Sequence, residues 1–581
     1  MALILGGSLF KLAQLRGGGT VVAERLGGMR IYPNTTDPHQ RRVLNVVEEM
    51  ALASGVPVPP VYFLPREQAI NAFAAGYTPS DAVVAVTRGC AEQLTRDQLQ
   101  GVIAHEFSHI LNGDMRLNIR LIGVLHGILL LGLLGRILLH STAYSGRGRS
   151  RNDSVAILLL VGLAVLVLGS IGTLIGNLIK AAVSRQREYL ADASAVQFTR
   201  NPGGISGALQ RIGAALSGSK LKHPGASEAS HMYFSTGVWE GFTGLMATHP
   251  PLGKRIRALD PTWDGKFPAA PEALPGATRG DPAGAGLAGL VGADRVDGTA
   301  DRVAVETVER ASDQVGQMTL AHRQYALQLV RSLPEPVTQA AHEPYGARAV
   351  IFGLLLDGRR DLRKIQMQRL AELALADVVE LTARLTPAID QVDLRARLPL
   401  IDMTLPALRA MAPPQYETFA HCLRELVAAD QKIGLFEWTL QRLLLRHLQP
   451  QFRPIHPRPV RYYGLQRLAD PCSILFSTLA QAGNSPEEAR AAHAAAARLL
   501  PEVRLRLLPS DACRLVNLDG ALRTLTRVSA KQRRRLIDAA AASICADGAV
   551  QVREAELLRA VSDMLDCPMP PLLPGQPLGT P

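Results

Sequence analysis

The sequence predicts an α+β domain that is interrupted by a transmembrane helical hairpin and followed by an all-α C-terminal region. Short runs of β-branched residues between amphipathic helices indicate the α+β part in residues 30–114. Two apolar segments follow at residues 121–139 and 155–179, and each is long enough to cross about 30 Å of hydrocarbon at about 1.5 Å per residue. In residues 301–575 the apolar positions recur at helical spacing.

Composition limits the classes of function. The chain has 581 residues, more than one hydrophobic core usually holds, so we expect at least two domains. Its net charge of +12 comes from scattered Lys and Arg residues, which together with apolar spans favours contact with anionic lipid over nucleic acid. The six cysteines are dispersed without a C-x-x-C pair, which predicts reduced thiols rather than a disulfide framework or a second zinc site.

The elements before the hairpin follow from local patterns. Residues 37–53 are predicted to form a helix, because their apolar residues recur at helical spacing. Residues 61–64 and 82–87 are rich in β-branched residues and are predicted to be strands. Residues 90–114 are predicted to be a helix with a short lead-in, with Thr95 at its start.

The two predicted spans carry small residues four apart, at Gly123-x-x-x-Gly127 and Gly172-x-x-x-Gly176. Such pairs let membrane helices approach each other closely. Basic residues lie on both sides of the hairpin, so the positive-inside rule gives no orientation.

Two histidines four apart in the helix of residues 90–114 predict a metal site. His105 and His109 project from one helix face, so both imidazoles reach a single metal ion. Zinc suits nitrogen ligands and keeps one coordination position open for water in catalytic sites, which predicts one Zn²⁺ per chain. Glu106 is then placed to take a proton from that water, whose pKa zinc lowers to about 7. The alternative is a buried helix that carries two histidines by chance.

A third ligand is expected after the second span. Glu188 completes a His, His, Glu set, and Asp192 lies one turn later, where it can accept the N–H of a zinc-bound imidazole. The alternative is that both carboxylates pair at the surface with Arg185 and Arg187. If Glu188 is not the ligand, His231 is the next candidate.

Four motifs follow one another within residues 30–260. They are Asn71-Ala72-Phe73-Ala74-Ala75-Gly76, H-E-F-S-H-I-L-N-G-D from His105, S-R-Q-R-E-Y-L-A-D from Ser184, and T-H-P-P-L-G-K-R-I from Thr248. Together they resemble the HtpX and CAAX-prenyl endopeptidase family of membrane zinc metallopeptidases. The resemblance implies a zincin fold, endopeptidase activity on peptide or membrane-protein substrates, and a multi-pass protein of the cell (inner) membrane with its catalytic domain on the cytoplasmic side.

The resemblance also implies roles for further residues. The Asn71–Phe73 segment contributes to a strand edge that pairs with the extended substrate backbone. His249 and Arg255 lie near the scissile carbonyl, where a donor or cation stabilises the developing oxyanion. From the residues alone, Asn71 is equally a loop cap, and the alternative for Arg255 is a structural pairing with an acid such as Asp260.

These patterns leave three functions open. The first is a membrane zinc endopeptidase in membrane-protein quality control or peptide processing, with Glu106 as general base. The second is a processor of modified C-terminal peptides, which the motifs do not separate from the first. The third is a membrane scaffold with a structural zinc and a helical partner-binding region. Structural zinc normally has four protein ligands, and three convincing ones here favour catalysis.

The second half offers fewer signals. Asp430–Glu437 and Asp547–Glu554 each place Asp and Glu seven apart and resemble the TerB-like helical fold, with helix capping by Asp as an equal alternative. Residues 1–10 are apolar but too short to span a bilayer, which predicts either an interfacial anchor or a shortened start. The predicted divisions are a membrane-embedded zinc metallopeptidase domain at 1–265, a flexible Pro/Gly/Ala linker at 266–300, a helical TerB-like region at 301–567 and a disordered tail at 568–581.

Overall fold

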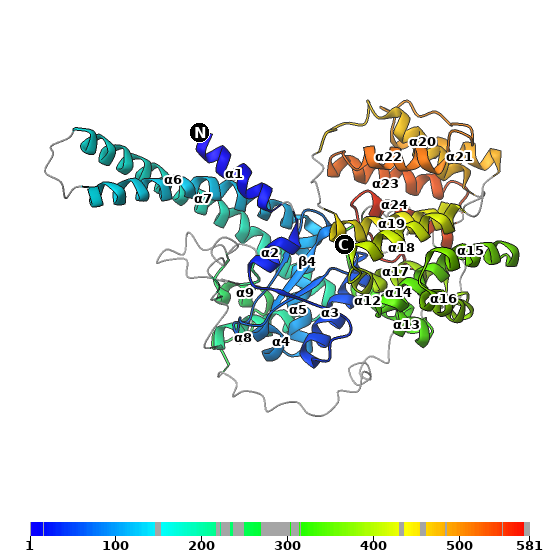
Figure 1. Cartoon of the computed structure of the whole chain (residues 1–581), viewed down its shortest axis with the longest axis horizontal. Coiled ribbons are helices and arrows are strands. Elements are labelled where there is room, and N and C mark those ends of the chain that lie inside the picture. The colour runs from blue at the N-terminus through cyan, green and yellow to red at the C-terminus, as the bar shows by residue number, and fades with distance from the viewer. Residues whose placement is uncertain are drawn as a thin grey trace.

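The computed structural model places a four-stranded sheet with its helices next to a separate body of helices, and a bundle of three helices projects from the sheet side (Figure 1). The predicted mixed α/β first half and helical second half are confirmed at this level. The structure describes residues 2–15, 17–145, 153–215, 221, 223, 233–235, 249–268, 302–303, 313, 315–428, 435–453, 460–482, 485–548 and 550–573.

The sheet has the strand order β1-β2-β4-β3, in which β2 and β4 are parallel and the outer pairs are antiparallel. The predicted strands at 61–64 and 82–87 are confirmed as β2 and β4, whereas β1 was not expected from its pattern. Alternate side chains of the central strands enter two apolar cores, one on each face of the sheet. The strands are β1 (Met29–Ile31), β2 (Val61–Leu64), β3 (Ala72–Ala75) and β4 (Val83–Thr87).

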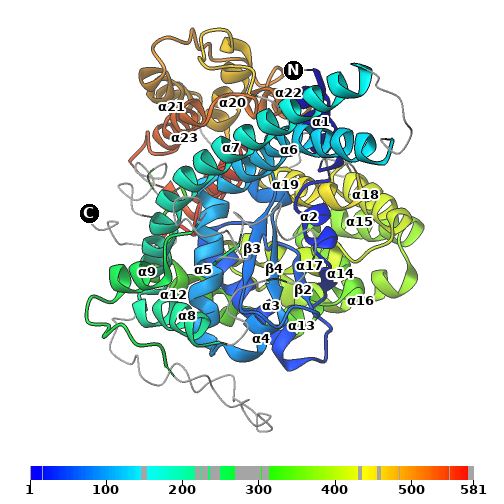
Figure 2. The ribbon, with the colours of Figure 1, turned by 90° about the vertical axis from the view of Figure 1, so that its left-hand side faces the viewer.

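Helices cover both faces of this sheet, and α5 runs beside β3 (Figure 2). Thr95 caps α5 through a reciprocal bond pattern with Gln98, and Gly113 ends it in the left-handed conformation at φ 72°. The turn at Gly113 separates α5 from the long helix that follows. The elements around the sheet are α2 (Gly19–Arg25), α3 (Pro38–Ser54), the 3-10 helix η1 (Pro79–Asp81), α4 (Arg88–Gln93), α5 (Arg96–Asn112), α8 (Pro202–Ala214) and α9 (Leu252–Leu259).

The projecting bundle consists of α1 (Ala2–Gln14), α6 (Asp114–Ser145) and α7 (Asp153–Thr199) (Figure 1). A Cβ at Gly127 would collide with the carbonyl of Ile4, so this glycine lets α1 lie against α6. The close approach of α6 to α7 falls elsewhere, where a Cβ at Gly169 would collide with the backbone of Gly132. The first G-x-x-x-G pair therefore makes room for α1, whose apolar residues were predicted to be an interfacial anchor or a shortened start.

Apolar side chains of the bundle face outward. Leu133 is 52% exposed, Leu160 69% and Leu168 64%, and Leu9 of α1 is 66% exposed. Among the described residues, one helix, Asp114–His140, is long and apolar enough to cross a membrane by length and composition. The second predicted span lies within α7, where the side chains of several residues fall outside the described set.

The second half is largely helical, with one short strand pair, β5 (Arg302–Val303) and β6 (Val550–Gln551). The last helix of the chain packs against two helices from the middle of this half, and the residues after it reach the turn at Gly55, beside the sheet. The helices are α12 (Leu320–Ser332), α13 (Glu335–Ala341), α14 (Pro344–Leu355), α15 (Arg360–Leu373), α16 (Ala376–Ile389), α17 (Leu394–Leu408), α18 (Pro413–Ala428), α19 (Leu435–Phe452), α20 (Ala469–Gln481), α21 (Pro486–Leu499), α22 (Leu515–Leu525), α23 (Ala530–Ile544) and α24 (Val552–Met564).

The two halves share one apolar core through α3, which packs against α12. Polar contacts accompany it: Glu48 of α3 lies 3.0 Å from Nε2 of His342, and the Arg409 guanidinium donates to the carbonyl of Val58. The tail predicted to be disordered from residue 568 instead continues in contact as far as residue 573, with Met569 buried against the turn at Gly55. Most of the predicted linker and of the Asp430–Glu437 segment lies outside the described residues.

Candidate active site

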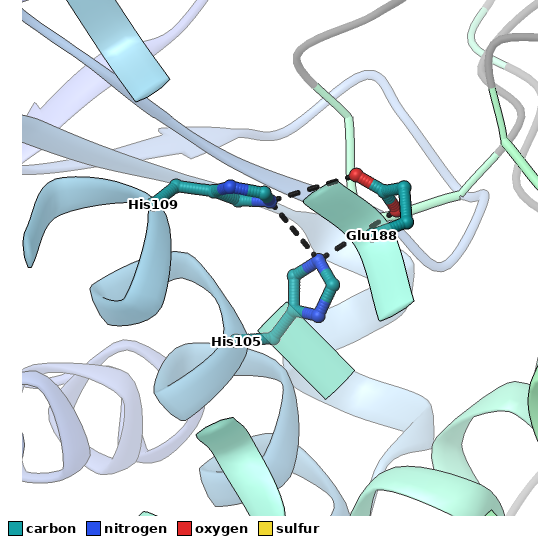
Figure 3. A group of neighbouring side chains, drawn as sticks. All are labelled: His105, His109 and Glu188. Carbon is teal, nitrogen blue, oxygen red and sulfur yellow. Dashed lines mark hydrogen bonds and ion pairs between the residues drawn. The ribbon is translucent and has the colours of Figure 1, made fainter. Parts of the chain in front are cut away.

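Helix α5 presents both predicted histidines to α7. His105 Nε2 lies 3.2 Å from His109 Nε2, and these atoms lie 3.7 Å and 3.6 Å from the two carboxylate oxygens of Glu188 (Figure 3). Tetrahedral zinc with ligands at about 2.0–2.1 Å separates neighbouring ligand atoms by about 3.4 Å. The spacings of the three side chains are close to this value, so they suit a zinc ion. Among the described residues, they are the one group of His, Cys, Asp and Glu whose ligand atoms all lie within 4.8 Å of one another.

Each histidine has a carboxylate on its other ring nitrogen. Asp192 Oδ1 lies 3.0 Å from Nδ1 of His105, and Asp114 Oδ2 lies 2.9 Å from Nδ1 of His109. An acceptor at Nδ1 fixes the tautomer that leaves Nε2 available to a metal. Asp192 was predicted in this place, whereas the role of Asp114 was missed. The signal for Asp114 was a carboxylate just after a helix-ending glycine.

Glu106 is fully buried, and neither of its carboxylate oxygens has a hydrogen-bond partner. Burial raises the pKa of Glu106 to about 8, with a smaller upward contribution from Glu188. These two oxygens lie next to the histidines, where a polar group such as a metal-bound water would donate a hydrogen bond to them. This orphaned carboxylate is the second observation that fits a zinc site.

The third ligand, Glu188, contacts two basic side chains from the segment after residue 248, His249 and Arg255. His249 Nδ1 lies 2.9 Å from Glu188 Oε2, and Nη1 of Arg255 lies 3.3 Å from the same oxygen. Burial alone would raise the pKa of Glu188, but His249, His109 and Arg255 lower it well below its usual value. Glu188 is therefore ionised, as a metal ligand must be.

Arg255 is completely buried and makes its main contacts with Asp192 rather than with the predicted alternative, Asp260. Its Nε and Nη2 donate to the two Asp192 oxygens at 2.8 and 2.6 Å, and Nη1 donates to the carbonyl of Phe234 at 2.7 Å. This forked pairing holds Asp192 against His105. The guanidinium acts on the site through Asp192 and Glu188.

The predicted substrate edge, β3, carries a segment of the chain itself. Phe234 N–H donates to the carbonyl of Ala72 at 2.9 Å, and Tyr233 pairs in antiparallel fashion with Phe73. The Asn71 side chain donates to the carbonyl of Ser235 at 3.2 Å. The Tyr233–Ser235 segment thus extends the sheet beyond β3.

This segment also closes the site from one side. The ring of Phe234 stands edge-on to His105 with centroids 4.9 Å apart. Glu106, Glu188 and His249 are all buried, so a polypeptide substrate requires the surroundings to open. His231, named as a reserve ligand, lies outside the described residues.

Residues 37–262 match the model of the family described as Peptidase family M48. The Protease HtpX homolog of Thermoanaerobacter pseudethanolicus is 40% identical over 227 residues, which cover 38% of this chain and 73% of that protein. The Protease HtpX homolog of Streptococcus uberis is 35% identical over 266 residues, or 45% of this chain and 84% of that protein. The chain belongs to peptidase family M48. It is a metallopeptidase, and the His105, His109 and Glu188 cluster is its candidate zinc site.

The M48 match ends where the first half ends. The similar protein from Listeria monocytogenes, also a Protease HtpX homolog, is 39% identical over 235 residues and covers 39% of this chain and 75% of its own length. The helical second half lies beyond the M48 match, and its TerB-like resemblance stays a prediction. No solved structure matches this chain.

Proposed function

We propose that this M48 chain is an integral-membrane zinc endopeptidase with a zincin-type catalytic domain, and that it acts in membrane-protein quality control or peptide processing. The observation that carries the catalytic part is that three protein donors converge, with spacings of 3.2 to 3.7 Å, beside an unpaired carboxylate. A structural zinc site would use four protein ligands, so three favour catalysis over the scaffold alternative.

In this proposal His105, His109 and Glu188 would hold a zinc ion, which when bound would acidify a water molecule and polarise the peptide carbonyl. Glu106 takes the proton from the water and passes it to the leaving amine. His249, fixed on Glu188 beside the ligand atoms, is proposed to donate to the developing oxyanion. Arg255 has its donors engaged by Asp192, Glu188 and the Phe234 carbonyl, so we assign it a positioning role instead of direct contact with the substrate.

The membrane part rests on the outward-facing apolar side chains of α1, α6 and α7. Such an apolar surface has a lower free energy in contact with hydrocarbon than in contact with water. Of the two helices that carry the proposed ligands, α7 belongs to this bundle and α5 adjoins it, so we propose that the site lies near the bilayer surface. We propose the cell (inner) membrane with a cytoplasmic catalytic side, and protein partners or substrates recruited by the helical region 301–567.

We expect residues 2–199 fused to a soluble reporter to stay with membranes through carbonate extraction. A matched fusion in which exposed Leu133, Leu160 and Leu168 are replaced by Asn should be released into the supernatant, because polar side chains in hydrocarbon cost several kcal/mol in sum. Release of the unmodified fusion as a monodisperse soluble protein would contradict the membrane proposal.

A substrate that pairs with β3 must take the place of the Tyr233–Ser235 segment, since both need the same backbone groups. Directly opposed residues of an antiparallel pair have Cα atoms about 4.5–5.5 Å apart, within the range of about 4.4–6.8 Å that a disulfide spans. The Phe73→Cys/Tyr233→Cys double variant should therefore cross-link when oxidised.

We expect the cross-linked variant to lose at least about 10-fold in peptide hydrolysis and to regain it on reduction, with zinc content unchanged. The single Cys variants and the unmodified chain, whose six cysteines stay in place, control for oxidation elsewhere. Equal rates for the oxidised and reduced double variant, with the cross-link verified by thiol titration, would show that substrate does not use this edge.

A further inference from the structure

We propose that Asp114 and Arg187 are positioning residues for the metal site: Asp114 sets the orientation of His109, and Arg187 holds Asp114 from the opposite arm of the hairpin. The inference rests on the metal binding proposed above. Neither residue was predicted from the sequence to have this role.

The local geometry supports the first contact. Asp114 is the first residue of α6 and follows the left-handed turn at Gly113, which directs its carboxylate back toward α5. The carboxylate is buried and lies 2.9 Å from Nδ1 of His109. A buried carboxylate at Nδ1 keeps the proton there, so the lone pair of Nε2 faces His105 and Glu188.

The second contact comes from α7. The guanidinium of Arg187 pairs with Oδ1 of Asp114, and Arg187 directly precedes the ligand Glu188. A buried carboxylate without a basic partner is costly, and Arg187 supplies that partner from the neighbouring helix. It ties the start of α6 to the part of α7 that carries the third ligand.

The two histidines thus have separate supports of the same kind. His105 is oriented by Asp192, which Arg255 of α9 holds, and His109 is oriented by Asp114, which Arg187 of α7 holds. Asp192 and Arg187 both lie on α7, but only the second support includes a residue of α6. A displacement of α6 relative to α7 therefore reaches the metal site through His109 and leaves the support of His105 in place.

The test measures zinc affinity of the full-length protein in detergent, by competition with a chelating dye. Asp114→Asn keeps the shape but loses the charge, and we expect zinc binding to weaken about 10–100-fold. Arg187→Gln should weaken it by a smaller factor, because this side chain is 38% exposed and water partly replaces it. Because Arg187 acts through Asp114, the double variant should bind zinc no more weakly than Asp114→Asn alone. Arg120→Gln, at an exposed residue of α6 one to two turns after Asp114, is the charge control and should bind zinc as the unmodified chain does.

A second readout separates positioning from general destabilisation. The visible spectrum of the Co²⁺-substituted protein should change in Asp114→Asn and not in Arg120→Gln, while the far-ultraviolet circular dichroism of both stays the same. If Asp114→Asn does not fold, Arg187→Gln alone decides. Unchanged zinc affinity in folded Asp114→Asn and Arg187→Gln, or additive losses in the double variant, would overturn the inference. Absence of zinc binding by the unmodified chain would instead refute the proposed function.

Discussion

Glu106→Gln is expected to bind zinc like the unmodified chain and to lose about 10²–10⁴-fold in peptide hydrolysis, the range typical of general-base removal. The amide has the same shape as the carboxylate but cannot take a proton from water. Glu106 is fully buried, and the neutral amide adds no charge to the interior. The measurement is turnover of a short unstructured peptide together with zinc per chain.

The matched control for this variant is Glu92→Gln, which makes the same chemical change at a partly exposed residue of α4 paired with Arg88. Its turnover should equal that of the unmodified chain. Near-normal hydrolysis by Glu106→Gln would remove Glu106 from the mechanism, whatever the zinc content.

Glu188→Ala is expected to lose both zinc and activity. The change removes one of three ligands. Replacing a residue that only hydrogen-bonds to a ligand lowers metal affinity by up to about 100-fold, so we expect a larger loss of zinc affinity here. It also leaves His249 and Arg255 buried without one of their carboxylate partners, so thermal stability should fall as well.

Glu188→Gln provides the comparison for that variant. It keeps one oxygen for the metal and most of the packing, so it should fold better than Glu188→Ala and bind zinc with intermediate affinity. Zinc content unchanged in folded Glu188→Ala would mean that the third ligand lies elsewhere in the chain.

The parts of the site that the sequence predicted are those set by local periodicity. His105 and His109 share a face because any α-helix places residues four apart on one side. Glu188 lies far along the chain, and it was proposed from its place after the second apolar span, with the ordered motifs as further support. The structure brings these three side chains to one point because α5 and α7 pack against each other.

The parts that were missed depend on contacts between distant segments. Small residues at Gly123 and Gly127 showed that a helix comes close, but only packing showed that the partner is α1. The segment at Tyr233 has no alternating pattern of its own and forms its bridge because the edge strand β3 offers it backbone groups. Asp260 is nearer to Arg255 in sequence, yet Asp192 is the acid that the fold presents.

The central claim is that His105, His109 and Glu188 hold a zinc ion that Glu106 uses for peptide hydrolysis. The most direct test measures zinc per chain and turnover of one short peptide on the same detergent-purified samples of the unmodified chain, Glu106→Gln and Glu188→Ala. We predict zinc and hydrolysis in the first, zinc without hydrolysis in the second, and neither in the third. Hydrolysis by Glu188→Ala after its zinc is lost, or an unmodified chain that hydrolyses the peptide without bound metal, would contradict the claim.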